Sequence, residues 1–118
     1  MSSLTDSPPP KLLVVCLCAQ WCGTCTEYQP LFTALQSEFA GARFMWVDVE
    51  DQSDLVDPIE VENFPTLLVA LGQSARFFGT VTPHLETLRR LIISSADLDA
   101  PALKDAEVQA LVQRLRAD

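Results

Sequence analysis

Basic side chains are scarce in this sequence. Its 8 Lys and Arg stand against 16 Asp and Glu, which gives a formal net charge of −8 at pH 7. Proteins that bind the phosphate backbone of nucleic acids need clustered Lys and Arg, and here only Arg89 and Arg90 are adjacent. We therefore expect no nucleic-acid partner.

Long apolar runs are missing as well. No apolar stretch reaches the roughly 20 residues that a transmembrane helix needs, and residues 1–10 hold Asp6 and three prolines instead of the basic and apolar regions of a secretory signal. We expect no membrane partner and no export. With 4 Cys and no export signal, the expected compartment is the reducing cytoplasm, in which thiols react instead of stapling the fold.

What the sequence does contain is enough apolar mass for one domain. Its 118 residues are 48% hydrophobic, which allows a single core. The composition divides the chain into a polar, proline-ended flexible lead-in over 1–10, a main domain over 11–96 and a C-terminal helical extension over 97–118.

Two cysteines lie where a buried strand is followed by a helix. Residues 12–18 form a short, continuous and partly β-branched apolar run, which predicts a strand buried on both faces. Residues 24–39 carry apolar side chains at spacings of three and four, which predicts a helix with one apolar face. Cys22 therefore lies at the first turn, where unpaired N–H groups and the helix dipole should stabilise its thiolate.

Cys25 lies one turn further along the same helix, close enough to reach Cys22, with only Gly23-Thr24 between them. A pair in which one sulfur attacks and the other resolves is the arrangement for thiol–disulfide exchange. The alternatives are a structural pair or half of a zinc site that Cys16 and Cys18 would complete. A zinc site is disfavoured because structural zinc knuckles lie on loops and not inside an apolar strand. We expect no metal or organic cofactor.

Three motifs in register resemble the thioredoxin family. Trp21-Cys22-Gly23-Thr24-Cys25 after a buried strand is similar to its active site, usually Trp-Cys-Gly-Pro-Cys, and Phe64-Pro65-Thr66 is similar to its cis-proline loop. Residues 46–50 are similar to the strand that follows the active-site helix, and Pro30 falls where the family kinks that helix. The resemblance covers roughly residues 12–95.

The resemblance implies a thioredoxin-like α/β fold, with a mixed sheet of about four strands and helices on both faces. The family usually has another strand and helix before the active-site strand. Residues 1–10 cannot form them, so we expect a fold that lacks the N-terminal βα unit. The further elements that the pattern predicts are a strand over 43–49, a helix and loop over 53–59 ended by Asp57-Pro58, a hairpin of strands 67–71 and 75–78, and a helix over 82–95 with Thr82 as its N-cap.

An extra C-terminal helix is predicted after a break at residues 97–101. It runs to about residue 116, and its apolar stripe consists of Val108, Leu111, Val112 and Leu115. The missing N-terminal helix would leave a sheet face bare, and exposed apolar area invites association. We therefore expect this helix to fold back onto its own domain and the protein to be a monomer. The alternative is that the helix pairs with another chain in a weak dimer.

The resemblance also implies the activity, which is that of a thiol–disulfide oxidoreductase acting on protein disulfides. Its electrons would come from a reductase or a dithiol donor. The residues implied are the attacking Cys22, the resolving Cys25, and the substrate-binding residues Trp21, Gly23, Thr24, Phe64, Pro65 and Thr66, with a cis bond between Phe64 and Pro65.

The sequence departs from the family pattern at several positions. Cys16 falls where the family usually carries a buried Asp that helps to deprotonate the inner cysteine, and Trp46 stands where a partner Lys is common. Thr24 replaces the usual proline. The added N–H and hydroxyl near Cys22 should make the disulfide more oxidising.

Cys16 and Cys18 are two residues apart on a strand, so they face the same side. They are either small buried hydrophobes or, in a second hypothesis, accessory thiols that exchange with Cys25 as a further redox store. The cysteine at position 16 and the acidic stretch 48–62 also leave an alternative function open. That alternative is a binding or chaperone-like module on the same fold, with weak or no redox turnover.

Overall fold

The computed structural model describes residues 12–19, 22–39, 41–57, 59, 61, 63–82, 84–97 and 99–117. The lead-in expected over residues 1–10 lies outside this range. The elements in chain order are β1 (Leu12–Cys18), α1 (Gly23–Glu38), β2 (Arg43–Asp48), α2 (Ser53–Val56), β3 (Thr66–Leu71), β4 (Ser74–Thr80), α3 (Leu85–Ser95) and α4 (Ala106–Ala117). No helix in the described part of the chain has the length and apolarity to cross a membrane.

The four strands form one mixed sheet in the order β2-β1-β3-β4. β1 runs parallel to β2 and antiparallel to β3, and β3 pairs with β4 in an antiparallel hairpin. Gly72 turns the hairpin with a φ of 62°, a left-handed conformation that glycine adopts without a steric penalty. The predicted fold class, a mixed sheet of about four strands, is confirmed.

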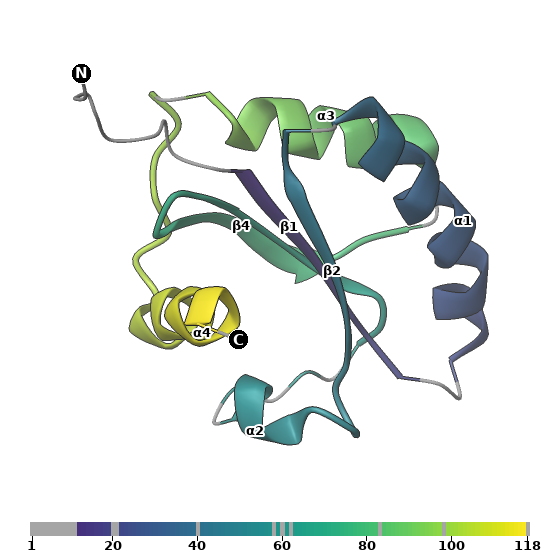
Figure 1. The fold of residues 1–118 in the computed structure, drawn as a ribbon, viewed down its shortest axis with the longest axis horizontal. Helices are drawn as coiled ribbons and strands as arrows, with labels where there is room; N and C mark the ends of the chain where they lie inside the picture. The colour runs from purple at the N-terminus through teal and green to yellow at the C-terminus, as the bar shows by residue number, and fades with distance from the viewer. Residues whose placement is uncertain are drawn as a thin grey trace, which may run out of the picture.

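Helices cover both faces of the sheet, α1 and α3 on one side and α2 and α4 on the other (Figure 1). β1 lies in the middle and alternates between the two layers, as strand geometry requires. Its odd-numbered side chains pack in the layer of α4, and its even-numbered ones pack in the layer of α1 and α3. Cys16 and Cys18 therefore face α1, and β1 is buried on both faces as predicted.

Helix α4 folds back onto its own domain, as expected. Its predicted stripe is at most 3% exposed and lies in one core cluster with the odd face of β1: Val108 3%, Leu111 0%, Val112 0% and Leu115 0%. The Asp105 carboxylate accepts the Glu107 N–H at 2.9 Å and so caps the start of the helix. The Gln109 side-chain oxygen accepts the Ala75 N–H of β4 at 2.9 Å. The helix therefore covers the sheet face that would otherwise be bare.

α2 makes a single turn and stops at Val56, next to the predicted stop at Asp57-Pro58, because Asp57 precedes a proline and has the extended backbone (φ −56°, ψ 142°) that this position favours. The start of α3 differs from the prediction. α3 begins at Leu85 with His84 as its N-cap. Thr82 is not the cap, because its carbonyl accepts the His84 N–H at 2.8 Å in a tight turn that precedes the helix.

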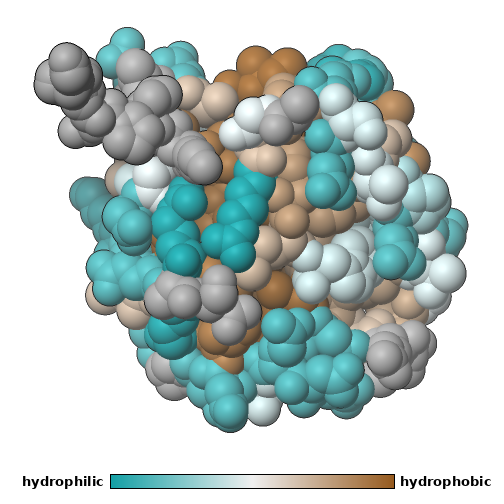
Figure 2. Space-filling model, in the orientation of Figure 1, coloured by the Kyte–Doolittle hydropathy of each residue, from teal (hydrophilic) through white to brown (hydrophobic). Residues whose placement is uncertain are grey.

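Strand β2 is an edge of the sheet and anchors α1. Figure 2 shows an apolar area in the middle of the face drawn, where β2 runs in front of the sheet in Figure 1. Phe32 of α1 makes edge-on ring contacts with Phe44 (5.1 Å between centroids) and Trp46 (5.6 Å) of β2. These contacts fix the position of α1, and with it the first turn of that helix, relative to the end of β1.

Candidate functional site

The site lies where β1 ends and α1 begins. Cys18 is the last residue of β1, Cys22 is the N-cap of α1, and Cys25 lies in the first turn of that helix. The Cys22 N–H donates to the Ala19 carbonyl at 3.0 Å, which closes a tight turn between the strand and the helix. Trp21, which we expect at the rim of the site, lies outside the described residues.

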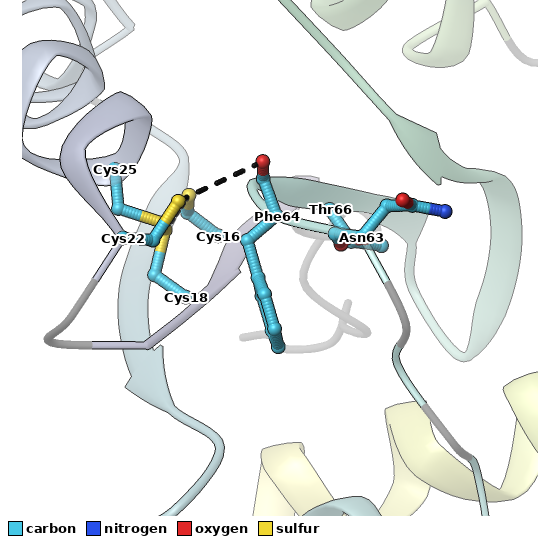
Figure 3. The surroundings of a disulfide bond; sticks show 7 residues. All are labelled: Cys16, Cys18, Cys22, Cys25, Asn63, Phe64 and Thr66. Carbon is cyan, nitrogen blue, oxygen red and sulfur yellow. Dashed lines mark hydrogen bonds between the residues drawn. A yellow bond between two sulfur atoms is a disulfide. The ribbon is translucent and has the colours of Figure 1, made fainter.

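The structure joins Cys25 to Cys18 in a disulfide and leaves Cys22 as a free thiol (Figure 3). This differs from the expected bond between Cys22 and Cys25. The reason is the direction of the β1 side chains, since Cys18 faces the α1 layer into which Cys25 also points. The two Cα atoms are 5.9 Å apart, well within the range of a disulfide. Cys18 and Cys25 are only 2% and 3% exposed.

Gly23 does not adopt a backbone conformation that only glycine favours. It is the first residue of α1, it is exposed, and its φ lies outside the left-handed region. A Cβ atom placed on it would meet nothing within 4 Å. The glycine therefore leaves an open surface beside Cys22, which suits the expected rim.

Cys22 faces the proline loop across the site. Its Sγ is 3.9 Å from the carbonyl oxygen of Phe64, to which the thiol donates. The peptide bond between Phe64 and Pro65 is cis, as the resemblance implied. Figure 3 shows the Phe64 carbonyl pointing toward the sulfur atoms and the Phe64 ring pointing away from them. The loop thus presents backbone to the one sulfur of the site that is only half-buried.

Thr66 holds the proline loop in place. Its hydroxyl donates to the Asn63 carbonyl at 2.6 Å, and its side chain is only 4% exposed. Next to it, the Pro65 carbonyl accepts the Val81 N–H at 3.1 Å. The Thr66 hydroxyl and the Pro65 carbonyl are therefore both engaged within the protein.

Cys16 is a fully buried thiol beside the disulfide. Its exposure is 0%, and its Sγ is 3.4 Å from that of Cys18. Burial raises the pKa of the Cys16 thiol far above its ordinary value, so the thiol stays protonated. Burial also raises the pKa of Tyr28, a residue whose hydroxyl has no hydrogen-bond partner among the described residues.

We expect the thiols of the folded, reduced protein to react with iodoacetamide at very different rates. Cys22 should be modified first, and Cys16 at least roughly tenfold more slowly, because a buried thiol must both open to solvent and ionise. Mass spectrometry of samples quenched over time measures both rates. The same protein in urea is the control, in which all four cysteines should react alike. Equal rates for Cys16 and Cys22 in the folded protein would contradict the burial described here.

A surface hollow of about 340 Å³ lies beside Cys25. Its lining consists of Ala19, Cys25, Thr26, Gln29, Trp46 and Asp48. Thr26 and Gln29 were not predicted, and their only signal in the sequence is their polarity at one and four residues after Cys25. The hollow is large enough to hold water.

Among the described residues, Asp48 is the acidic residue of the stretch 48–62 that lines the hollow beside Cys25. Asp48 accepts the N–H groups of Glu50 (2.9 Å) and Asp51 (3.2 Å), so its carboxylate ties its own loop. Glu50, Asp51, Asp54 and Asp57 are exposed, as in an ordinary solvated loop. Over the described ranges, no group of three or more His, Cys, Asp or Glu side chains is placed to hold a metal ion.

These observations define a class of site. A disulfide links the end of a strand to the first turn of a helix, and a further thiol at the helix N-cap faces a cis-proline loop. This is a site for thiol–disulfide exchange on an α/β domain.

Comparisons with known proteins give the family. A family model described as Thioredoxin matches residues 4–92. A thioredoxin H2-2 from Oryza sativa subsp. japonica is 34% identical over 92 residues, which span 76% of this chain and 69% of that protein. The thioredoxin of Homo sapiens is 38% identical over 90 residues, which span 74% of this chain and 86% of the human protein. Among solved structures, the X-ray structure of Fasciola hepatica thioredoxin has a TM-score of 0.66 at 27% identity and covers 72% of this chain and 81% of that chain.

The chain belongs to the thioredoxin family. Its relatives and its nearby cysteine pair make it a thiol–disulfide oxidoreductase.

Proposed function

We propose that the protein reduces or forms disulfides of other proteins through Cys22 and Cys25. The observation that carries this proposal is the placement of Cys22. Its thiol is half-buried, lies at the N-cap of a 16-residue helix and faces the backbone of the proline loop. The thiolate is the form of a cysteine that attacks a disulfide, and Cys22 is the cysteine of the site that is not buried.

In the reducing direction the reaction starts from the dithiol form, in which Cys25 is a free thiol. The Cys22 thiolate attacks a substrate disulfide, forms a mixed disulfide and releases the first substrate thiolate. Cys25 then loses its proton to water in the adjoining hollow and attacks the Cys22 sulfur. The bond between Cys22 and Cys25 forms, the second substrate thiolate leaves, and two electrons have passed to the substrate. A reductase or dithiol donor must restore the dithiol.

The substrate would lie against the proline loop. The backbone of Phe64 would pair with the substrate, in the manner of an added strand, and Thr66 holds the loop through Asn63. Trp21, Gly23 and Thr24 would form the rim. We infer a monomer, since α4 covers the sheet face of its own chain. We also infer a cytoplasmic location, because a thiol that must attack disulfides needs reducing surroundings.

The test of this function is the reduction of insulin disulfides with dithiothreitol as the electron source. We expect turnover within roughly an order of magnitude of an ordinary thioredoxin, because attacking thiol, resolving thiol and proline loop are all present. Turnover no faster than dithiothreitol alone, from protein whose thiols are intact, would overturn the proposal. It would favour the alternative of a binding or chaperone-like module.

Replacing Thr24 by proline (Thr24→Pro) should make the Cys22–Cys25 disulfide more reducing, by roughly tens of millivolts. The change removes the backbone N–H at the second residue of α1 and the hydroxyl near Cys22, and both favour the thiolate. Equilibration with glutathione buffers, followed by mass analysis, measures the potential. Thr26→Ala, an exposed position in the same turn, is the control, and an unchanged potential in Thr24→Pro would refute the effect.

A further inference from the structure

Cys25 lies within reach of two different cysteines. One is Cys22, three residues earlier at the N-cap of the same helix, and the other is Cys18, at the end of β1, to which the structure bonds it. The proposed function uses only the first pairing. The second is a separate oxidised arrangement of the same site, with Cys22 left free.

We propose that Cys18 is a third redox-active cysteine, which takes over the disulfide from Cys22 by attacking Cys25. This rests on the proposed function, whose product is the Cys22–Cys25 disulfide. The Cys18 thiolate attacks the Cys25 sulfur, the Cys18–Cys25 bond forms, and the Cys22–Cys25 bond breaks. Cys22 leaves as a thiolate and is protonated by the proton that Cys18 gave up. The exchange keeps both oxidising equivalents inside the protein and needs no other oxidant.

The surroundings favour this direction of exchange. The leaving sulfur, Cys22, sits at a helix N-terminus, where N–H groups and the dipole stabilise a departing thiolate. The product disulfide is enclosed between β1 and α1, with Cys18 2% and Cys25 3% exposed, so a bulky reductant cannot reach it directly. Cys16 does not compete for the bond, because it is fully buried and stays a thiol, with its Sγ 3.4 Å from that of Cys18.

The exchange changes what the oxidised protein can do. With the disulfide held at Cys18–Cys25, Cys22 is again a half-buried thiol facing the proline loop. It can still attack a disulfide, but Cys25 is no longer available to resolve the mixed disulfide. The Cys22 thiolate of the oxidised protein therefore attacks a disulfide compound, keeps one half of it as a mixed disulfide and releases the other half as a thiolate. The mixed disulfide persists until a reductant opens the Cys18–Cys25 bond. Oxidised glutathione is a suitable small probe of this capture.

Disulfide mapping with chymotrypsin distinguishes the two pairings. Cleavage after Trp21 and Tyr28 leaves Cys22 and Cys25 in one peptide and Cys18 in another, whereas trypsin cuts nowhere between residues 12 and 42. The full chain is oxidised by insulin under limiting dithiothreitol, its free thiols are blocked, and it is digested in denaturant at mildly acidic pH. We expect the peptide of Cys18 to be linked to that of Cys25, with the blocking group on Cys22. A bond confined to Cys22 and Cys25 would overturn the inference, although insulin reduction would continue and the proposed function would stand.

Intact mass after incubation with oxidised glutathione tests the consequence. Wild-type protein should accumulate one glutathione, on Cys22. Cys18→Ala should accumulate at least roughly tenfold less, because Cys25 is then free to expel the glutathione. Cys16→Ala removes the neighbouring buried thiol and is the matched control, which should behave as the wild type does. Equal glutathione on Cys18→Ala and wild type would contradict the proposal. Should Cys18→Ala fold poorly, as its melting temperature would show, the mapping of the wild-type disulfide decides alone.

Discussion

Replacing the attacking thiol (Cys22→Ser) should abolish insulin reduction, with a loss of roughly a thousandfold or more in turnover. A serine hydroxyl does not ionise near neutral pH, so the helix N-cap has no anion to stabilise and no covalent intermediate forms. The dithiothreitol-coupled insulin assay measures the loss. The fold should not change, because Cys22 is only half-buried and the substitution leaves its backbone hydrogen bond to Ala19 in place.

Two further variants make this result specific. Cys16→Ala is the matched control, since it also removes a free thiol of the site, and it should keep its turnover. Cys25→Ser should attack but not resolve, so that a mixed disulfide with insulin accumulates on Cys22 and is visible on a non-reducing gel. If Cys22→Ser retained more than about a tenth of the wild-type turnover, Cys22 would not be the nucleophile.

Truncating a buried leucine of the C-terminal helix (Leu111→Ala) should cost about 2–5 kcal/mol of the free energy of unfolding. Leu111 is 0% exposed and packs against the odd-numbered face of β1. The loss would be a large share of the roughly 5–15 kcal/mol that holds a domain of this kind together. Urea titration followed by circular dichroism measures it.

Gln113→Ala is the control on the same helix. Gln113 is exposed and lies two residues from Leu111, so its loss should change the free energy of unfolding by no more than about 0.5 kcal/mol. Ending the chain after Ala96 removes all of α4 and should leave a protein that aggregates or fails to fold, because the apolar sheet face is then uncovered. A shortened chain that stays monomeric, with the melting temperature of the full chain, would show that α4 is dispensable.

Much of the fold could be predicted because the apolar patterns of single strands and helices show which of their faces are buried. The apolar run over 12–18 predicted a strand buried on both faces, and the structure has α1 and α4 on opposite sides of it. The stripe of the C-terminal helix predicted that it would be covered. The cis bond before Pro65 followed from the resemblance.

The end of α2 at Val56 agrees with the stop predicted at Asp57-Pro58, because the residue before a proline is held extended. The start of α3 was predicted wrongly, because short-range interactions compete there. α3 was expected to begin at the Thr82-Pro83 pair, but a tight turn from the Thr82 carbonyl to the His84 N–H comes first. Boundaries of this kind depend on single hydrogen bonds, which a pattern of apolar residues does not encode.

The sequence by itself determined that two cysteines stand at the start of a helix after a buried strand, and from this position it predicts that Cys22 is reactive. Spacing along the chain shows only which cysteines are close in sequence. It therefore favoured a disulfide between Cys22 and Cys25, which are three residues apart. Only the tertiary structure decided that a third sulfur, seven residues from Cys25, would be bonded to it. The physical reason is the alternation of β1, which turns Cys18 into the layer where the contacts of α1 with β2 hold Cys25.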